Sequence, residues 1–177
     1  MKHLFLSALA FLITINLQSQ SVTKITKSTE IIALQSSVQL DSDGFDIDEE
    51  IAINIETFET SEEDFFQDFL VFSFFKFNDM VQRKVKYTYV MIGDDVPELR
   101  NLLDYVWSQR KEDNIRIEDN PSFGFYVYEN ELLTIRMDFG DYLENPVGYP
   151  IESLQFTIDL KQIKMLRKHL SSSFLYE

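Results

Sequence analysis

Residues 30–55, EIIALQSSVQLDSDGFDIDEEIAINI, alternate apolar and polar side chains on both sides of the tetrapeptide DSDG at 41–44. The apolar residues on each side share one parity: Ile32, Leu34, Val38 and Leu40 come before it, and Phe45, Ile47, Ile51, Ile53 and Ile55 come after it. A two-residue period is typical of strands that bury one face. The stretch therefore predicts a β-hairpin, and with it a domain built largely on antiparallel sheet.

The segment DSDGFDIDEE, residues 41–50, also resembles a calcium-binding loop. Such a loop needs acids at positions 1, 3 and 5, Gly at position 6 and Glu at position 12. With Gly44 at position 6, position 1 falls on Gln39, and a loop that starts at Asp41 has Ala at position 12. Both registers lack a ligand, so we predict no metal site. A four-residue loop, 41–44, around a type I turn fits better, because Asp opens it and Gly closes it.

This turn fixes a register for the predicted hairpin. The register pairs Leu40 with Phe45, Val38 with Ile47, Leu34 with Ile51 and Ile32 with Ile53. It also places Asp46, Asp48 and Glu50 in a row on the opposite face, where neighbours are about 7 Å apart. A solvated acidic surface is the ordinary interpretation. The alternatives are a docking surface for a basic protein partner and a weak cation site. We therefore take Asp46, Asp48 and Glu50 as the candidate partner-binding residues.

Six further stretches have the composition or alternation of strands: 70–77, 83–92, 115–117, 123–128, 132–139 and 154–160. In 83–92 one apolar face is expected, formed by Val85, Tyr87, Tyr89 and Met91. Residues 62–70 fit both a helix and a strand, because Phe65, Phe66 and Phe69 also follow helical spacing. A strand is favoured from about Phe69.

Two segments predict helices, 95–111 and 160–171. The first has Asp95 as its cap and an apolar stripe of Leu99, Leu102, Leu103, Val106 and Trp107. The second has Asp159 as its cap, with Gln162 completing a capping box. The predicted fold class is α+β: an antiparallel sheet of six to eight strands with both helices packed on one face.

Residues 1–21 have the order of a secretory signal peptide: Lys2, an apolar run over 4–17, and a small-residue exit at 19–21. A buried helix or a membrane anchor is the alternative, but a membrane span needs about 20 apolar residues. We therefore predict an exported protein, periplasmic or extracellular, with no membrane anchor after cleavage. The remaining residues, 22–177, contain no repeat or linker and predict a single domain.

Composition excludes several classes of function. The chain has no cysteine, which excludes disulfides, thiol catalysis and zinc–thiolate sites. Its formal net charge is −14 at pH 7. That sign excludes nucleic-acid binding through phosphates and disfavours an anionic membrane surface. It is compatible with solubility or with a basic protein partner.

Catalytic motifs are missing from the sequence. It has no phosphate-binding loop, no dinucleotide-binding loop and no nucleophile elbow, so we predict no enzyme activity, no catalytic residue and no cofactor. His169 is expected at the surface or at a helix end. A glycosidase needs only two carboxylates, for which Asp138, Asp141 and Glu144 are candidates. Aromatic residues that could hold a sugar are more simply explained as core: Trp107, Tyr126, Tyr128, Tyr142 and Tyr149.

The later half has the order helix ELRNLLDYVWSQ (98–109), strands in IRIEDNPSFGFYVYENELLTIRMDFG (115–140), strand LQFTIDL (154–160) and helix KQIKMLRKHL (161–170). This order, in a small acidic chain, resembles immunity proteins of bacterial polymorphic-toxin systems. The resemblance covers residues 95–170 and assigns a functional role to none of them. It implies a protein that binds a toxin without catalysis, and the leader implies a toxin that acts in the periplasm. We therefore expect an exported non-enzymatic binding module, with a small secreted carbohydrate-binding or carbohydrate-active protein as the alternative.

Overall fold

The computed structural model describes residues 22–40, 43–62, 65–112, 114–118, 124–138, 140 and 148–171. The predicted signal peptide, 1–21, lies outside them. Within the described residues, no helix is both long enough and apolar enough to cross a membrane. These residues form eleven strands and two helices, which confirms the α+β class.

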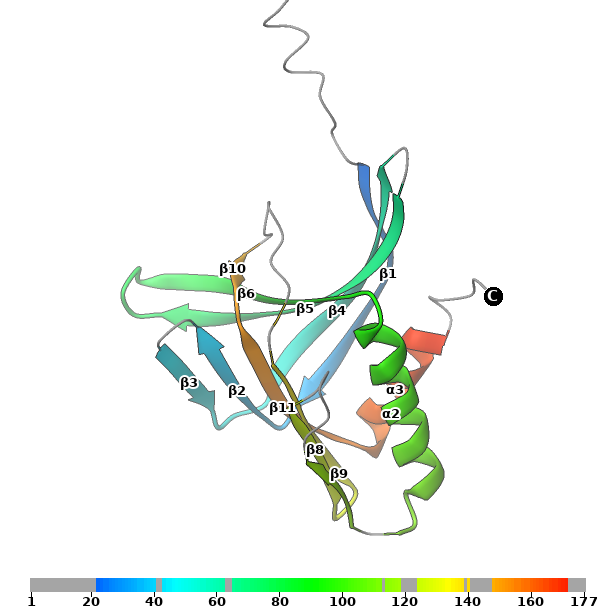
Figure 1. The fold of residues 1–177 in the computed structure, drawn as a ribbon. Helices are drawn as coiled ribbons and strands as arrows, with labels where there is room; N and C mark the ends of the chain where they lie inside the picture. The colour runs from blue at the N-terminus through cyan, green and yellow to red at the C-terminus, as the bar shows by residue number, and fades with distance from the viewer. Residues whose placement is uncertain are drawn as a thin grey trace, which may run out of the picture.

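The strands form two sheets (Figure 1). In order across the five-stranded sheet lie β1 (Val22–Ala33), β4 (Ile51–Glu62), β5 (Phe65–Asn78), β6 (Arg83–Ile92) and β10 (Tyr149–Pro150). In order across the six-stranded sheet lie β3 (Asp43–Ile47), β2 (Gln35–Leu40), β11 (Ser153–Asp159), β9 (Leu132–Met137), β8 (Phe125–Glu129) and β7 (Ile115–Glu118). All described pairings are antiparallel except that of β10 with β6. The strand expected from about Phe69 is present as part of β5, which begins earlier, at Phe65.

The expected single sheet of six to eight strands is wrong, and the bend at Leu34 explains why. The bend separates β1, which belongs to the five-stranded sheet, from β2, which belongs to the six-stranded one. The Leu34 amide donates to the Thr157 carbonyl oxygen at 2.8 Å. The buried residues are Ile31 and Ala33 before the bend and Ser36 and Val38 after it, so the buried parity changes there.

The predicted hairpin register is therefore wrong in both halves. In β1 it is Ile31, not Ile32, that pairs with Ile53. In the other sheet Val38 pairs with Phe45 rather than with Ile47. Asp43 and Gly44 are paired residues of β3, so the predicted four-residue loop over 41–44 is also wrong.

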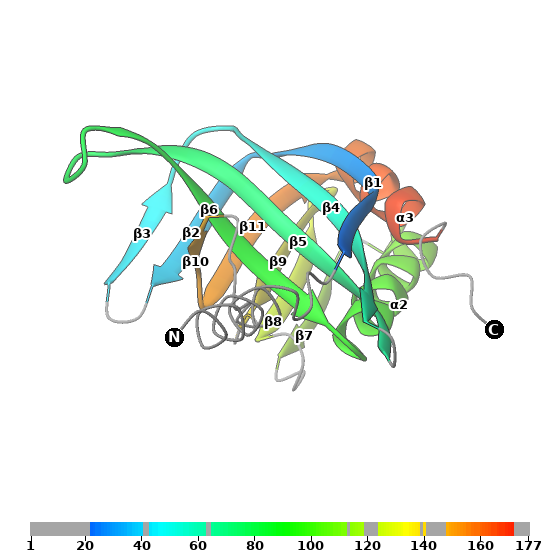
Figure 2. The same ribbon diagram turned by 90° about the horizontal axis from the view of Figure 1, so that it is seen from above.

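The main core lies between the two sheets and the helices (Figure 2). Phe72 of β5 and Phe156 of β11 meet across it, with ring centroids 6.0 Å apart. The predicted apolar face of β6 is confirmed, because Val85, Tyr87, Tyr89 and Met91 are all buried. A second, smaller cluster lies on the opposite face of the five-stranded sheet: Phe58, Phe69, Val71 and Val90.

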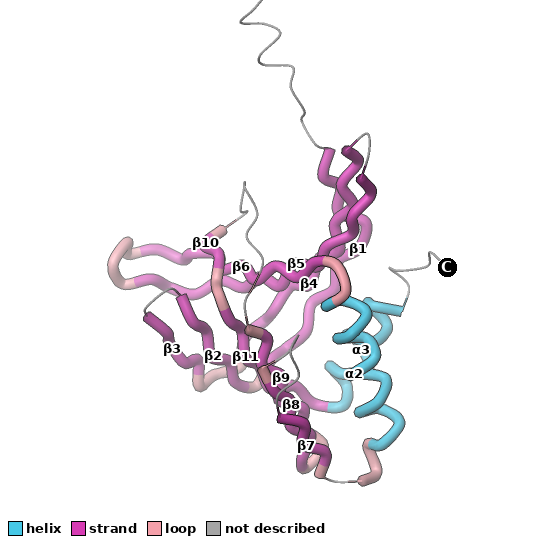
Figure 3. Tube along the Cα trace, viewed as in Figure 1, coloured by secondary structure: helices cyan, strands magenta, loops and turns pink. Residues whose placement is uncertain are grey.

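The two helices lie side by side (Figure 3). α2 (Asp95–Gln109) contacts α3 and β6, and α3 (Leu160–Ser171) contacts β1, β9 and β11, so the helices contact strands of both sheets. α2 begins where expected, but its cap residue is Asp94, which makes no capping bond with its side chain. The predicted cap of α3 is confirmed, since Asp159 Oδ1 accepts from the Gln162 amide at 2.8 Å.

Gln162 does not complete a capping box. Its Oε1 instead accepts from the Ile32 amide at 3.1 Å, which ties the start of α3 to β1.

Candidate functional site

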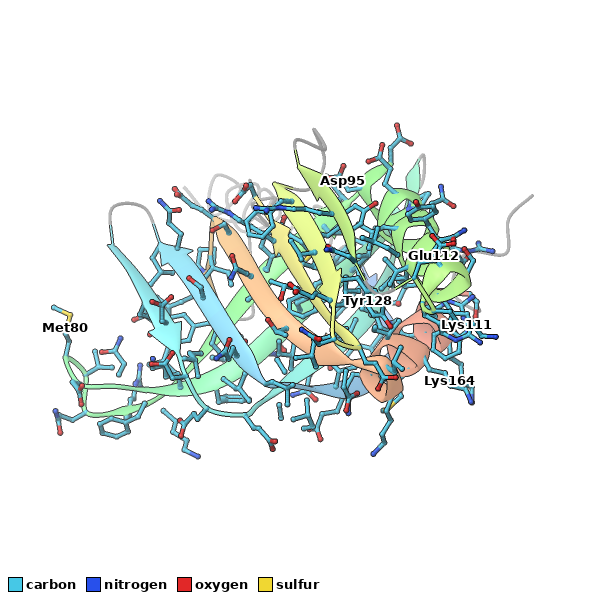
Figure 4. The ribbon with its side chains drawn as sticks, turned by 90° about the horizontal axis from the view of Figure 1, so that it is seen from below. Met80, Asp95, Lys111, Glu112, Tyr128 and Lys164 are labelled. Carbon is cyan, nitrogen blue, oxygen red and sulfur yellow. The ribbon has the colours of Figure 1, made fainter. Side chains whose placement is uncertain are left out.

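The β5–β6 hairpin projects beyond the rest of its sheet (Figure 1). The described pairing of β4 with β5 ends at Ser73, so the outer part of β5 pairs only with β6, as far as Asn78 opposite Arg83. The turn between them is ordered by Asn78, whose Oδ1 accepts from the amides of Met80 at 3.0 Å and Val81 at 3.3 Å. Figure 4 shows Met80 at the far end of this hairpin, with Lys111 and Lys164 at the opposite end of the molecule.

Large apolar side chains are exposed on this hairpin. Phe75 is 54% exposed, Phe77 49%, Met80 94% and Val81 44%. We call these four residues the hairpin patch. Phe75 and Phe77 lie on the opposite strand face from Phe74, which is buried in the main core. A soluble protein seldom exposes adjacent large apolar side chains without a use for them.

Cations surround the hairpin patch, although the chain as a whole is acidic. Phe75 pairs with Lys86 and Phe77 pairs with Lys84, so aromatic and basic side chains share one face. Arg83 is exposed beside them. On the inner face, Lys76 Nζ lies 4.2 Å from the centre of the Phe45 ring and donates to the Asp46 carbonyl oxygen at 3.2 Å.

Of the predicted partner-binding residues, Asp46 contacts this hairpin, and the three do not form a row on one strand. Asp46 lies in β3 opposite Ser37. Because β3 ends at Ile47, Asp48 and Glu50 lie in the connection that leads to β4 in the other sheet. All three side chains are exposed, and none of them forms an ion pair with another described residue. Lys76 links Asp46 to the base of the hairpin.

Asp46 also borders a hollow of about 230 Å³ on the outer face of the six-stranded sheet. Its polar lining comes from Ser37, Gln39, Asp46, Arg136, Ser153 and Gln155. Arg136 is oriented by Asp138, whose Oδ1 accepts from Nε at 2.7 Å. The hollow therefore presents hydroxyl, amide and charged groups to a ligand of small size.

Comparisons with family models, with curated proteins and with solved structures found no match. The assignment of a function therefore depends on the surfaces of this chain alone.

Most of the aromatic residues considered for sugar binding belong to the core, as expected. Tyr126 and Tyr128 are buried, and Tyr128 Oη donates to the Arg110 carbonyl oxygen at 3.0 Å. Burial, with a smaller effect of Tyr105, raises the pKa of Tyr126. Trp107 is partly buried against the core, and Tyr149 is half-exposed. Tyr142 and the carboxylates Asp141 and Glu144 lie outside the described residues.

His169 lies in the last turn of α3, at a helix end as expected, but it is buried within the fold rather than at the surface. Its Nε2 lies 2.9 Å from Thr57 Oγ1, and its Nδ1 lies 2.9 Å from Thr29 Oγ1. Burial, together with the nearby ammonium group of Lys27, lowers the pKa of His169 to about 4. The imidazole is therefore neutral at pH 7 and connects α3 to β1 and β4.

The hairpin patch was missed in the sequence because Phe75 and Phe77 belong to 70–77, a stretch predicted as a strand without any prediction of which side chains it exposes. A local signal does exist in KFNDMVQRKVK, residues 76–86. There four cations flank one turn of a strongly acidic chain, and such a local reversal of charge is typical of a contact surface.

Proposed function

We propose that this chain is an exported, non-enzymatic protein that binds a protein partner, with the hairpin patch as the main contact. The observation that carries the proposal is the exposure of Phe75, Phe77, Met80 and Val81 on a projecting hairpin. Aromatic residues, Met and Arg are enriched where proteins bind one another, and a few buried anchors supply most of the binding energy. The most specific form of the proposal is an immunity-type inhibitor that covers a toxin.

The acidic residues of β3 and of the connection that follows it supply a second contact in this proposal. Asp46, Asp48 and Glu50 are exposed and would face basic groups of the same partner. Surface charge of this kind acts mainly on the association rate and on specificity. Their contribution should therefore decrease as salt concentration rises.

The test is capture of a partner from the exported fraction of the native cell, followed by affinity measurement with the purified partner. Phe77→Ser and Met80→Ser should each weaken binding by about 2 kcal/mol, roughly 30-fold. Ile25→Ser is the matched control, because Ile25 is 50% exposed on β1, outside the hairpin. Unchanged affinity in the hairpin variants would remove the patch as the contact.

The acidic residues are tested by the triple variant Asp46→Asn, Asp48→Asn, Glu50→Gln. We expect slower association with the same partner, and a smaller dependence of the rate on salt. If association and its salt dependence are unchanged, these residues are only solvated surface.

A carbohydrate-binding function is the second candidate, favoured by the polar hollow beside Asp46. Its hydroxyl, amide and charged groups match the donors and acceptors of sugar hydroxyl groups. Arg136→Ala should abolish any signal that the wild-type chain gives on a glycan array. A silent array for the wild-type chain would exclude this candidate.

A further inference from the structure

One edge of β6 is covered only in part. β10 pairs with β6 at Tyr87 and Thr88, and Ile151 continues with one bond to the Thr88 carbonyl oxygen at 2.9 Å. Beside residues 83–86, the described chain places no further strand on that side. Within the part of the chain that the structure describes, the projecting hairpin therefore has a strand edge over residues 83–86 that pairs with no strand, although Gly148 lies close to the Lys86 carbonyl oxygen.

The alternation of strand backbone decides which groups face this edge. The Thr88 carbonyl points to β10, so the amide and carbonyl groups of Lys86 and Lys84 point to the same side. Gly148 confirms the direction, since a Cβ added there would lie 2.7 Å from the Lys86 carbonyl oxygen. Lys84 thus presents an amide and a carbonyl outward, and Lys86 presents an outward amide.

A groove of about 500 Å³ runs along this edge and is lined by residues 83–86 and 148–150. The edge of residues 83–86 is about 13 Å long, because each residue of extended chain spans about 3.3 Å. The side chains beside the groove are basic: Arg83, Lys84 and Lys86, of which Lys86 also lies 4.0 Å from Glu56. Lysine on a strand edge also deters unwanted pairing. A purely protected edge would not explain the exposed Phe75 and Phe77 on the same hairpin.

We propose that an extended, acidic segment of a protein partner adds to β6 as a further strand along residues 83–86. This inference rests on the proposed function, because it names how the partner of the hairpin patch binds. The outward amide and carbonyl groups can form hydrogen bonds with the backbone of another strand, as in strand addition. The cations select carboxylate side chains. A lipid surface would satisfy the charges but not the backbone groups.

The probe is a fluorescein-labelled heptapeptide of alternating glutamate and valine, added to the full chain and followed by anisotropy. Two control peptides are compared: one with lysine in place of glutamate, and one acidic peptide N-methylated at alternate amides. We expect saturable binding of the first peptide only, with affinity at least about tenfold higher than that of either control.

The protein variants separate the backbone contribution from the charge. Lys84→Pro removes the outward amide and leaves the bonds to β5 in place, because proline is tolerated on an edge whose amide faces outward. Lys84→Ala removes the same charge but keeps the amide. We expect binding to weaken about tenfold or more in Lys84→Pro and only about threefold in Lys84→Ala. In the wild-type chain, bound peptide should slow hydrogen exchange at the Lys84 and Lys86 amides.

Several outcomes would overturn the inference. The N-methylated peptide could bind as tightly as the unmodified acidic peptide, or bound peptide could leave hydrogen exchange at the Lys84 and Lys86 amides unchanged. The acidic peptide could also fail to bind, with or without sedimentation of the protein with phosphatidylglycerol vesicles. The peptide controls keep the test valid even if Lys84→Pro does not fold. If a captured partner loses affinity in Phe77→Ser but the acidic peptide does not bind, strand addition is rejected and the proposed function stands. If the acidic peptide binds along β6 but no captured partner loses affinity in Phe77→Ser, the proposed function is rejected.

Discussion

Acidification should destabilise this protein through His169. In the native state burial and Lys27 lower the pKa of His169 to about 4 from an ordinary value of 6.5. Above pH 6.5 the imidazole is neutral in both the folded and the unfolded chain, so its contribution is constant there. Between pH 6.5 and 4 the unfolded chain binds a proton that the folded chain does not. Stability is therefore lost as the pH falls through this window.

The size of the effect follows from the shift. Each unit of pKa difference corresponds to about 1.4 kcal/mol, so the full loss by pH 4 is about 3 kcal/mol at most. The charged group that acts on the imidazole is Lys27 of β1, and the Thr29 and Thr57 hydroxyls that hydrogen-bond to the ring do not titrate.

The assay is urea unfolding at intervals of about 0.5 pH unit from pH 7.5 to 4, on the wild-type chain and on His169→Gln. Glutamine retains hydrogen-bonding groups but does not titrate. At pH 7 the variant should be less stable by about 1–2 kcal/mol because it cannot bridge Thr29 and Thr57 with the same geometry. Its stability should then fall less steeply than that of the wild type below pH 6.5. Parallel stability curves over the whole range would refute the assignment of this pH dependence to His169.

Three further predictions concern local structure. Asp159→Ala removes the acceptor for the first turn of α3 and should lower the free energy of unfolding by about 1 kcal/mol in chemical denaturation. Glu131→Gly should raise it by about 0.5–1 kcal/mol, because Glu131 has φ 62° in the turn between β8 and β9; an unchanged or lower melting temperature would count against this. Arg167→Ala removes the contact with Asp104 and the guanidinium whose carbon lies 5.1 Å from the Trp107 ring centre. It should change the emission of this sole tryptophan while costing no more than about 1 kcal/mol, and an unaltered spectrum would contradict the stacking.

Local periodicity was sufficient to place most of the strands and both helices. The segment 83–92 was predicted with the bounds of β6 and with the correct buried face, since apolar and polar residues alternate from Val85 to Tyr89. The register of the hairpin predicted over residues 30–55 was wrong, because Ile31 and Ile32 place an apolar side chain on each face of the strand. The choice between them is made by the bend at Leu34, which depends on a bond to distant Thr157.

The candidate surfaces were harder to predict than the elements that carry them. Phe75 and Phe77 resemble core residues, and their exposure follows from where the pairing of β4 with β5 ends. His169 resembles a surface residue, and its burial follows from the packing of α3 on β1. In both cases the deciding contact joins segments that are remote in sequence, which a local pattern does not encode.

The packing of α3 on β1 also bears on how the chain acquires its structure. Gln162 bonds to Ile32, His169 bonds to Thr29, and Lys27 Nζ donates to the Lys168 carbonyl oxygen. These contacts span most of the described chain, and such nonlocal contacts form slowly. β1 cannot complete its packing until α3 has been synthesised. A growing chain should therefore not complete this fold until α3 has emerged from the ribosome.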